Sequence, residues 1–152
     1  MSNKTQPSSL GLYTLAAERS SNAVIASYST SFGVATKLLA PEIRQHVRNI
    51  YALVRVADEI VDGAAAEARS GGGNVEPSVA LDALEAEIYK TLRSHFSTNL
   101  VVHAFAKTAN ETGFARGIIE PFFASMRMDL WPRKHSPESF SKYVYGSAEV
   151  VG

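Results

Sequence analysis

Residues 41–62 constrain the fold most, because they predict a helix that is apolar around most of its circumference. Pro41 suits the first turn of a helix, where its missing N–H costs nothing. A helix of this kind has to be buried against other elements. One polar stripe interrupts the apolar surface. Its members share a face because they recur at steps of three or four residues: Arg44, Arg48, Tyr51, Arg55, Asp58 and Asp62.

The rest of the chain also favours helices. Apolar residues recur at helical spacing and no strand alternation of useful length is present, so the predicted fold class is all-α. The 152 residues suit one domain or a piece of one. Residues 1–9 are expected to form a loose N-terminus. Residues 64–78 are expected to form a loop, because Gly71-Gly72-Gly73-Asn74 suits no regular element. Besides 41–62, the predicted helices cover residues 10–28, 32–39, 79–92, 100–112, 121–130 and 136–152.

The composition excludes several classes of function. The 15 acidic residues balance 15 basic ones, whereas a nucleic-acid binder normally has a basic excess, so no nucleic-acid partner is expected. The absence of cysteine excludes disulfides, thiolate zinc sites and cysteine nucleophiles. No apolar run is long enough to span a membrane, and the N-terminus lacks the features of a secretory signal. We expect a cytoplasmic protein, with peripheral membrane contact left open.

Asp58 and Asp62 are the pair that indicates chemistry. Like charges one turn apart repel along a helix, and the C-terminal end of the helix dipole disfavours negative charge. A hard divalent cation would offset both effects, and Mg²⁺ typically takes one or two carboxylates together with substrate phosphates. Arg55, one turn earlier, can donate a fork of hydrogen bonds to a diphosphate. The alternative is a solvated strip in which Arg55 pairs with Asp58 or Glu59, and such surface pairs are worth about 0–1 kcal/mol.

The segment from Ser27 to Gly63 carries a resemblance to a known family. It contains, in order, a Ser-x-Ser-Phe element, a Leu-Leu-Pro-like turn, an Ile-Tyr-Ala-x-x-Arg helix and an Asp-x-x-x-Asp motif: SYSTSFGVATKLLAPEIRQHVRNIYALVRVADEIVDG. Two later stretches follow the same pattern, MRMDL at residues 126–130 and YVYGSAEVVG at residues 143–152. From about Ala17 onward the chain resembles the squalene and phytoene synthase family.

The resemblance implies an all-α class I isoprenoid (terpenoid) synthase fold around a large central cavity, of which this chain is the N-terminal half. It implies Mg²⁺-dependent head-to-head condensation of two prenyl diphosphates, and such a site also accepts Mn²⁺ in place of Mg²⁺. The motifs favour geranylgeranyl diphosphate as substrate and phytoene as product, in carotenoid biosynthesis. The alternatives are a squalene or dehydrosqualene synthase that uses farnesyl diphosphate, and a non-catalytic helical scaffold or assembly protein on the same fold.

The family's functional residues carry over by position. Asp58 and Asp62 resemble the Mg²⁺ ligands, and Arg55 resembles the diphosphate-binding arginine. The other implied residues contact diphosphate (Ser29, Ser31), line the cavity wall (Phe32) or face the reacting centre (Tyr51, Tyr143). A tyrosine there can stabilise a cation with its ring and move a proton with its hydroxyl. The alternative for the two serines is a turn or capping role, and for the two tyrosines a place in the core.

Three positions depart from the family pattern. Glu59 follows Asp58 where the family often has a second aspartate, and the two outer aspartates are kept. Thr30 stands where relatives often carry Lys or Arg, which weakens one expected diphosphate contact. Glu149 stands where many relatives have Gly. The family's second aspartate-rich motif falls beyond residue 152, so residues 1–152 alone are expected to be inactive.

Overall fold

The computed structural model describes residues 6–114 and 117–130, and every regular element within these residues is an α-helix. The predicted all-α class is therefore confirmed. None of the described helices is both long enough and apolar enough to cross a membrane. In chain order the helices are α1 (Ser9–Tyr28), α2 (Thr30–Thr36), α3 (Pro41–Asp62), α4 (Ala64–Ser70), α5 (Pro77–Ser94), α6 (Leu100–Thr112) and α7 (Ile119–Met128).

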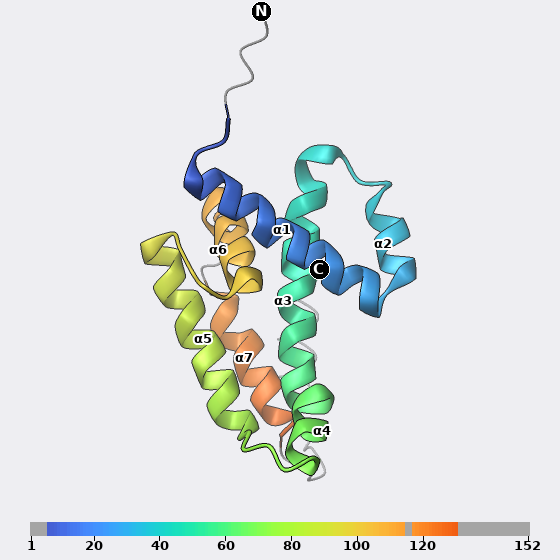
Figure 1. The fold of residues 1–152 in the computed structure, drawn as a ribbon, viewed down its shortest axis with the longest axis vertical. Coiled ribbons are helices and arrows are strands. Elements are labelled where there is room, and N and C mark those ends of the chain that lie inside the picture. Colours follow the sequence, from blue (N-terminus) through green and yellow to red (C-terminus); the bar gives the residue numbers. More distant parts are fainter. Residues whose placement is uncertain (1–5, 115–116, 131–152) are drawn as a thin grey trace, which may run out of the picture.

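Helix α3 is the centre of the described fold. It contacts each of the other described helices. In Figure 1, α1 crosses α3 near its upper half, α5 and α7 run beside its lower half, and α2 stands away from the bundle beyond the end of α1. This arrangement leaves α3 with one side against the core and one side toward α1 and α2.

The hydrophobic core lies between α3, α5, α6 and α7. Burial of these apolar side chains is the main term that stabilises the bundle, at about 25 cal/mol per Å² removed from water. The prediction that the apolar helix at residues 41–62 is buried holds in part, because α3 contributes Leu53 and Ala57 to this core while Ile43 at its start is exposed. The largest buried members are Leu53 from α3, Leu81, Leu84 and Ile88 from α5, Val102 and Phe105 from α6, and Ile119, Phe122, Phe123 and Met126 from α7.

A buried amide fixes the rotation of α3 against α6. The side chain of Asn49 is fully buried, and its Nδ2 donates to Thr108 Oγ1 at 2.9 Å and to the carbonyl oxygen of Ala104 at 3.3 Å. Its Oδ1 accepts from Gln45 Nε2 at 2.9 Å. Because a buried amide without partners is costly, these bonds favour one register of the two helices. That register decides which way the polar stripe of α3 faces.

Serine residues begin the first two helices. Ser8 Oγ accepts from the backbone N–H of Gly11 at 3.0 Å, which satisfies one free N–H of the first turn of α1. Ser29 separates α1 from α2, and its Oγ accepts from the N–H of Phe32 at 3.1 Å. Helix α1 thus includes Ser9, which was expected in the loose N-terminus. Helix α2 starts at Thr30, two residues earlier than predicted.

The loop expected at residues 64–78 is wrong for its first half. Residues Ala64–Ser70 form α4, and α5 already begins at Pro77. The sequence of α4 is AAAEARS, and alanine has the highest helix propensity of the common residues. Only the segment around Gly71–Gly73 is irregular, and Gly72 there has φ of 96°, a conformation that glycine adopts without strain. The helix predicted for residues 136–152 lies outside the described residues.

Candidate functional site

The first two arginines of the polar stripe hold α2 against α3. Arg44 Nη2 donates to the carbonyl oxygens of Lys37 and Leu39, each at 3.0 Å, and so closes the connection between the two helices. Arg48 Nε donates to Thr36 Oγ1 at 3.4 Å. These contacts give Arg44 and Arg48 a structural role at the base of α2.

Arg55 has a different environment from the other two arginines. Its guanidinium carbon lies 4.4 Å from the centroid of the Tyr28 ring, in a cation–π contact. Its Nη2 lies 3.2 Å from Glu59 Oε1, and the hydrogen bond to Glu59 raises the pKa of Arg55. The pairing of Arg55 with Glu59 that sequence allowed is therefore present. The Nε of Arg55 is buried and has no hydrogen-bond partner among the described residues.

Glu59 joins three parts of the structure. Besides Arg55, its carboxylate accepts a hydrogen bond from the backbone N–H of Ala64 at 3.3 Å, and the Tyr28 hydroxyl lies near enough to affect its pKa. The contact with the Tyr28 hydroxyl, followed by the hydrogen bond from Arg55, lowers the pKa of Glu59, and the contact with Glu59 raises the pKa of Tyr28. Glu59 thus connects the end of α1, the last turns of α3 and the start of α4.

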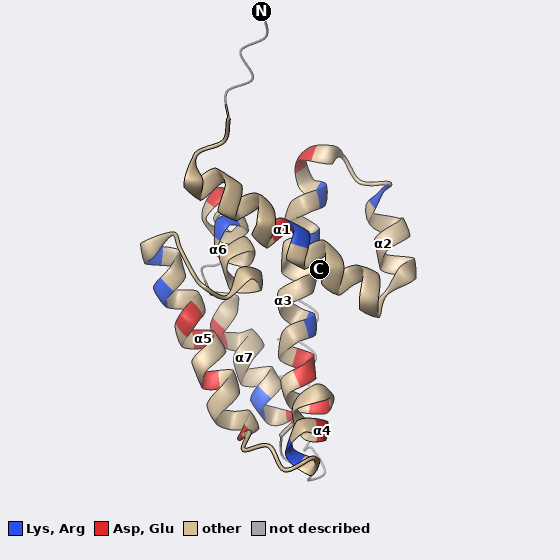
Figure 2. Ribbon diagram, viewed as in Figure 1, with Lys and Arg blue, Asp and Glu red and all other residues tan. Residues whose placement is uncertain are grey.

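Asp58 and Asp62 occupy the acidic C-terminal end of α3, which Figure 2 shows in red. Asp58 is half-buried and Asp62 is exposed. Burial raises the pKa of the Asp58 carboxyl above its usual value, and the charge of Arg55 opposes this shift. The negative charges of Asp129, Glu59 and Asp62 act in the same direction as burial. The contribution of Asp129 shows that the end of α7 lies close enough to Asp58 to affect it.

A hard divalent cation fits this end of α3. The anionic form of Asp58 is disfavoured by burial and by three neighbouring carboxylates, and a bound cation would offset that cost. Residues 6–114 and 117–130 contain no group of three or more acidic or histidine side chains that would form a complete metal cage. Mg²⁺ needs no such cage, because it retains waters and takes substrate phosphates as ligands. Asp58 and Asp62 are the residues that would hold it.

Two aromatic rings lie further along the same face of α3. Phe32 of α2 stacks on Tyr51 of α3, with ring centroids 4.3 Å apart and planes inclined by 21°. Tyr51 precedes Arg55 by one helical turn. The structure therefore brings Phe32, Tyr51 and Arg55 to one side of α3, as expected for residues of one site.

The two predicted serines are not beside the aspartates. Ser29 Oγ caps α2, so the capping alternative holds for this atom. Ser29 also lines a hollow of about 350 Å³ together with Lys37 and Arg48. Arg48 lies about 15 Å before Asp58 along the helix axis, at about 1.5 Å per residue. Ser31 is exposed on α2. Tyr143 lies outside the described residues.

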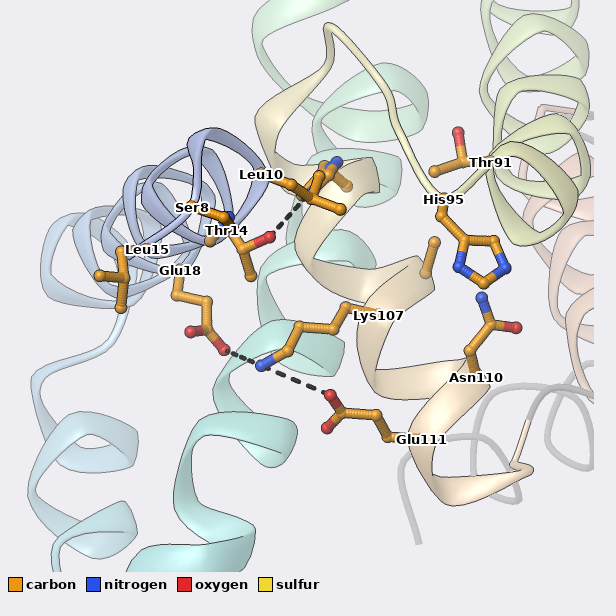
Figure 3. A pocket seen from close by; sticks show the side chains of 13 residues that line it. Ser8, Leu10, Thr14, Leu15, Glu18, Thr91, His95, Lys107, Asn110 and Glu111 are labelled. Atoms are coloured by element: carbon orange, nitrogen blue, oxygen red, sulfur yellow. Dashed lines mark hydrogen bonds and ion pairs between the residues drawn. The ribbon is translucent and has the colours of Figure 1, made fainter. Parts of the chain in front are cut away.

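A larger pocket, of about 540 Å³, lies on a different part of the molecule, where α1, α6 and the end of α5 meet. Figure 3 shows Lys107 in this pocket between the carboxylates of Glu18 and Glu111, at 3.4 Å and 3.7 Å. None of the predicted site residues lines it. Its charged groups are paired with one another, so the pocket does not compete with the end of α3 as the candidate site.

Sequence reasoning missed Tyr28 and the full role of Glu59. Glu59 stands four residues after Arg55, which is the spacing of an ion pair on a helix, and that signal was visible. Tyr28 directly precedes the Ser-x-Ser-Phe element, but nothing in the sequence indicated that its ring covers Arg55.

The described helices and the acidic pair at the end of α3 define an all-α protein with the isoprenoid synthase fold. The squalene/phytoene synthase family model matches residues 25–152, so the chain belongs to the squalene/phytoene synthase family. It is 29% identical over 125 residues to a 15-cis-phytoene synthase of a Paracoccus species, covering 82% of this chain and 41% of that protein. It is 30% identical over 150 residues to the chloroplastic phytoene synthase 2 of Solanum lycopersicum, covering 96% of this chain and 44% of that protein. The chain spans less than half the length of these curated relatives.

Proposed function

We propose that this chain supplies the aspartate and arginine side of a Mg²⁺-dependent site that condenses two prenyl diphosphates head to head. The observation that carries the proposal is the environment of Asp58. Its carboxylate is half-buried, near other acids and one turn from Arg55 and from Asp62, in a chain of this family. A bound cation would offset the cost of keeping this carboxylate charged.

Each residue has a role in this proposal. Asp58 and Asp62 hold the cation, and the bound Mg²⁺ supplies the positive charge that stabilises diphosphate as a leaving group. Arg55 donates hydrogen bonds to diphosphate oxygens and adds a second positive charge at the same place. Tyr51, whose ring stacks on Phe32, would supply a ring that stabilises a cation and a hydroxyl that moves a proton. Ser29, whose Oγ caps α2, and Ser31 would contact diphosphate at the start of α2, away from the aspartates.

The favoured substrate is geranylgeranyl diphosphate and the favoured product is phytoene. The support is that both relatives described above are named as phytoene synthases, at about 30% identity to this chain. A squalene or dehydrosqualene synthase that uses farnesyl diphosphate is the alternative within the same reaction class.

The test uses the natural-length protein that contains this chain, purified and incubated with Mg²⁺ and either geranylgeranyl or farnesyl diphosphate. We expect a C40 hydrocarbon from the first substrate. The D58N and D62N variants should lose turnover by at least about a hundredfold, as expected when a group that stabilises the leaving group is removed. A matched control is E42Q, which removes an exposed carboxylate in the first turn of the same helix. Consumption of farnesyl diphosphate alone would overturn the phytoene assignment, and full activity in D58N would overturn the site.

A further inference from the structure

The hydrogen bonds of Glu59 make its carboxylate a poor candidate for a metal ligand. Its Oε1 pairs with Arg55 Nη2 at 3.2 Å, and its Oε2 accepts from the N–H of Ala64 at 3.3 Å. Glu59 is also less exposed than Arg55, at 19% against 33% of the side chain. Each oxygen of this carboxylate already has a donor, which competes with a cation for it.

Gly63 has no side chain, and the Glu59 carboxylate occupies the space that a side chain there would fill. A Cβ atom at residue 63 would lie 1.8 Å from Glu59 Oε2 and 2.8 Å from its Cδ, distances at which atoms overlap. The Glu59 carboxylate therefore occupies the space that any other residue at position 63 would need. Gly71 provides the contrast, because a Cβ there would meet the carbonyl oxygen of Glu67 at 3.5 Å, an ordinary contact.

The guanidinium of Arg55 is held from two directions. Glu59 fixes one edge through a charge-assisted hydrogen bond, and the Tyr28 ring covers one face at 4.4 Å. An arginine side chain has many rotamers, and a pair of contacts of this kind selects few of them. We propose that Glu59 is a positioning residue that orients Arg55 toward the diphosphate, and that Gly63 is required because its missing side chain leaves room for Glu59. This inference rests on the proposed function, since it names what orients that site's arginine.

Two other roles for Glu59 lead to different expectations. As a metal ligand, Glu59 would affect the affinity for Mg²⁺, and its effect would persist when Arg55 is absent. As a purely structural ion pair, it would affect unfolding and leave diphosphate affinity unchanged. A positioning role predicts weaker diphosphate binding that depends on Arg55 and an unchanged Mg²⁺ affinity.

The experiment measures the dissociation constant of inorganic pyrophosphate by calorimetry at saturating Mg²⁺, with the natural-length protein. We expect E59A and G63A each to weaken binding by about tenfold, the lower end of the loss on removing a partner of a binding residue. The E59A/G63A double variant should bind no more weakly than E59A, because both changes remove the same contact. In an R55A background E59A should have no further effect. G71A is the matched control and should bind as the wild type does.

A second readout follows the orientation of Arg55 directly. The ¹⁵N–¹H signals of its Nη groups, assigned by comparison with R55K, should lose protection from exchange in E59A and in G63A, because Glu59 accepts from Nη2. Circular dichroism and a thermal scan show whether each variant is folded. If E59A does not fold, E59Q takes its place in the binding measurement, because its amide oxygen still accepts from Arg55. Equal pyrophosphate affinity in wild type, E59A and G63A overturns the inference alone, as does tighter binding in E59A. Failure of the wild-type protein to bind pyrophosphate with Mg²⁺ overturns the proposed function and this inference with it.

Discussion

The ring of Phe32 stacks on the ring of Tyr51 at a centroid distance of 4.3 Å, and this is the contact that ties α2 to the polar face of α3. We expect F32L and Y51L each to lower the free energy of unfolding, and the double variant to show a coupling of about 1 kcal/mol. Urea unfolding of the four proteins checks this. Y51F keeps both rings, so it should unfold like the wild type and lower turnover only. A coupling near zero would show that the stack does not anchor α2.

The charge of Asp58 is expected to lower the stability of the metal-free protein and to bind Mg²⁺ when the metal is present. We expect D58N to raise the free energy of unfolding by a few tenths of a kcal/mol in the presence of a chelator, because the substitution removes a like-charge repulsion with Asp62 on the helix. Added Mg²⁺ and pyrophosphate should raise the melting temperature of the wild type and leave that of D58N unchanged. Thermal scans with and without the ligands measure both effects. Lower stability of D58N in chelator would contradict this reasoning.

The buried His103 makes stability depend on pH. The N–H of Ser97 donates to its Nδ1 at 3.2 Å, so its Nε2 carries the proton and donates to Thr14 Oγ1 at 3.0 Å. Burial, and then the charge of Lys107, lower the pKa of His103 below its usual value of about 6.5. The unfolded chain therefore binds the second ring proton, which charges the imidazole, more tightly than the folded chain does.

The sign of the pH effect follows from that difference. Stability is fully present above about pH 6.5 and is lost as the pH falls below it, by at most about 1.4 kcal/mol per pH unit. Urea unfolding at neutral and mildly acidic pH measures the slope. H103Q, which keeps one acceptor and one donor without titrating, should flatten it. The exposed His95 offers the control, because H95Q should keep the wild-type slope.

Asn49 should be among the least replaceable residues of α3. N49A removes all four hydrogen bonds of a fully buried amide, so we expect a loss of about 2–3 kcal/mol in the free energy of unfolding. N110A is the control, since Asn110 is exposed and makes one bond to the carbonyl of Leu92. That variant should lose about 1 kcal/mol or less. Similar losses in the two variants would show that Asn49 does not fix the register of α3 and α6.

The sequence carried enough information for most helices, because their apolar periodicity is what packing requires. Helix α3 was predicted with its observed boundaries, since Pro41 and Gly63 mark both ends. The loop predicted after Gly63 is wrong because the three consecutive glycines at 71–73 indicate irregular structure only for their own segment. The alanines before them favour a helix locally. Such a short helix is decided by local propensity and by contact with α3, and the contact cannot be read from periodicity.

The candidate site was predictable in part for the same reason. Residues on one helix have known relative positions, so Tyr51, Arg55, Asp58 and Asp62 could be placed together from their spacing alone. Contacts between helices have no such rule. The cover that Tyr28 gives Arg55 depends on how α1 crosses α3, and the burial of Asp58 depends on where α7 ends.

The close approach of Glu59 to Gly63 links two positions whose evolution should not be independent. A Cβ at residue 63 and a glutamate carboxylate in its observed place cannot coexist at 1.8 Å. Homologues with a larger residue at the position of Gly63 should therefore carry a shorter or differently directed side chain at the position of Glu59. Aligned homologues would show this as covariation between neighbouring turns of one helix end, and a substitution at residue 63 in a designed variant displaces the Glu59 carboxylate from its observed place.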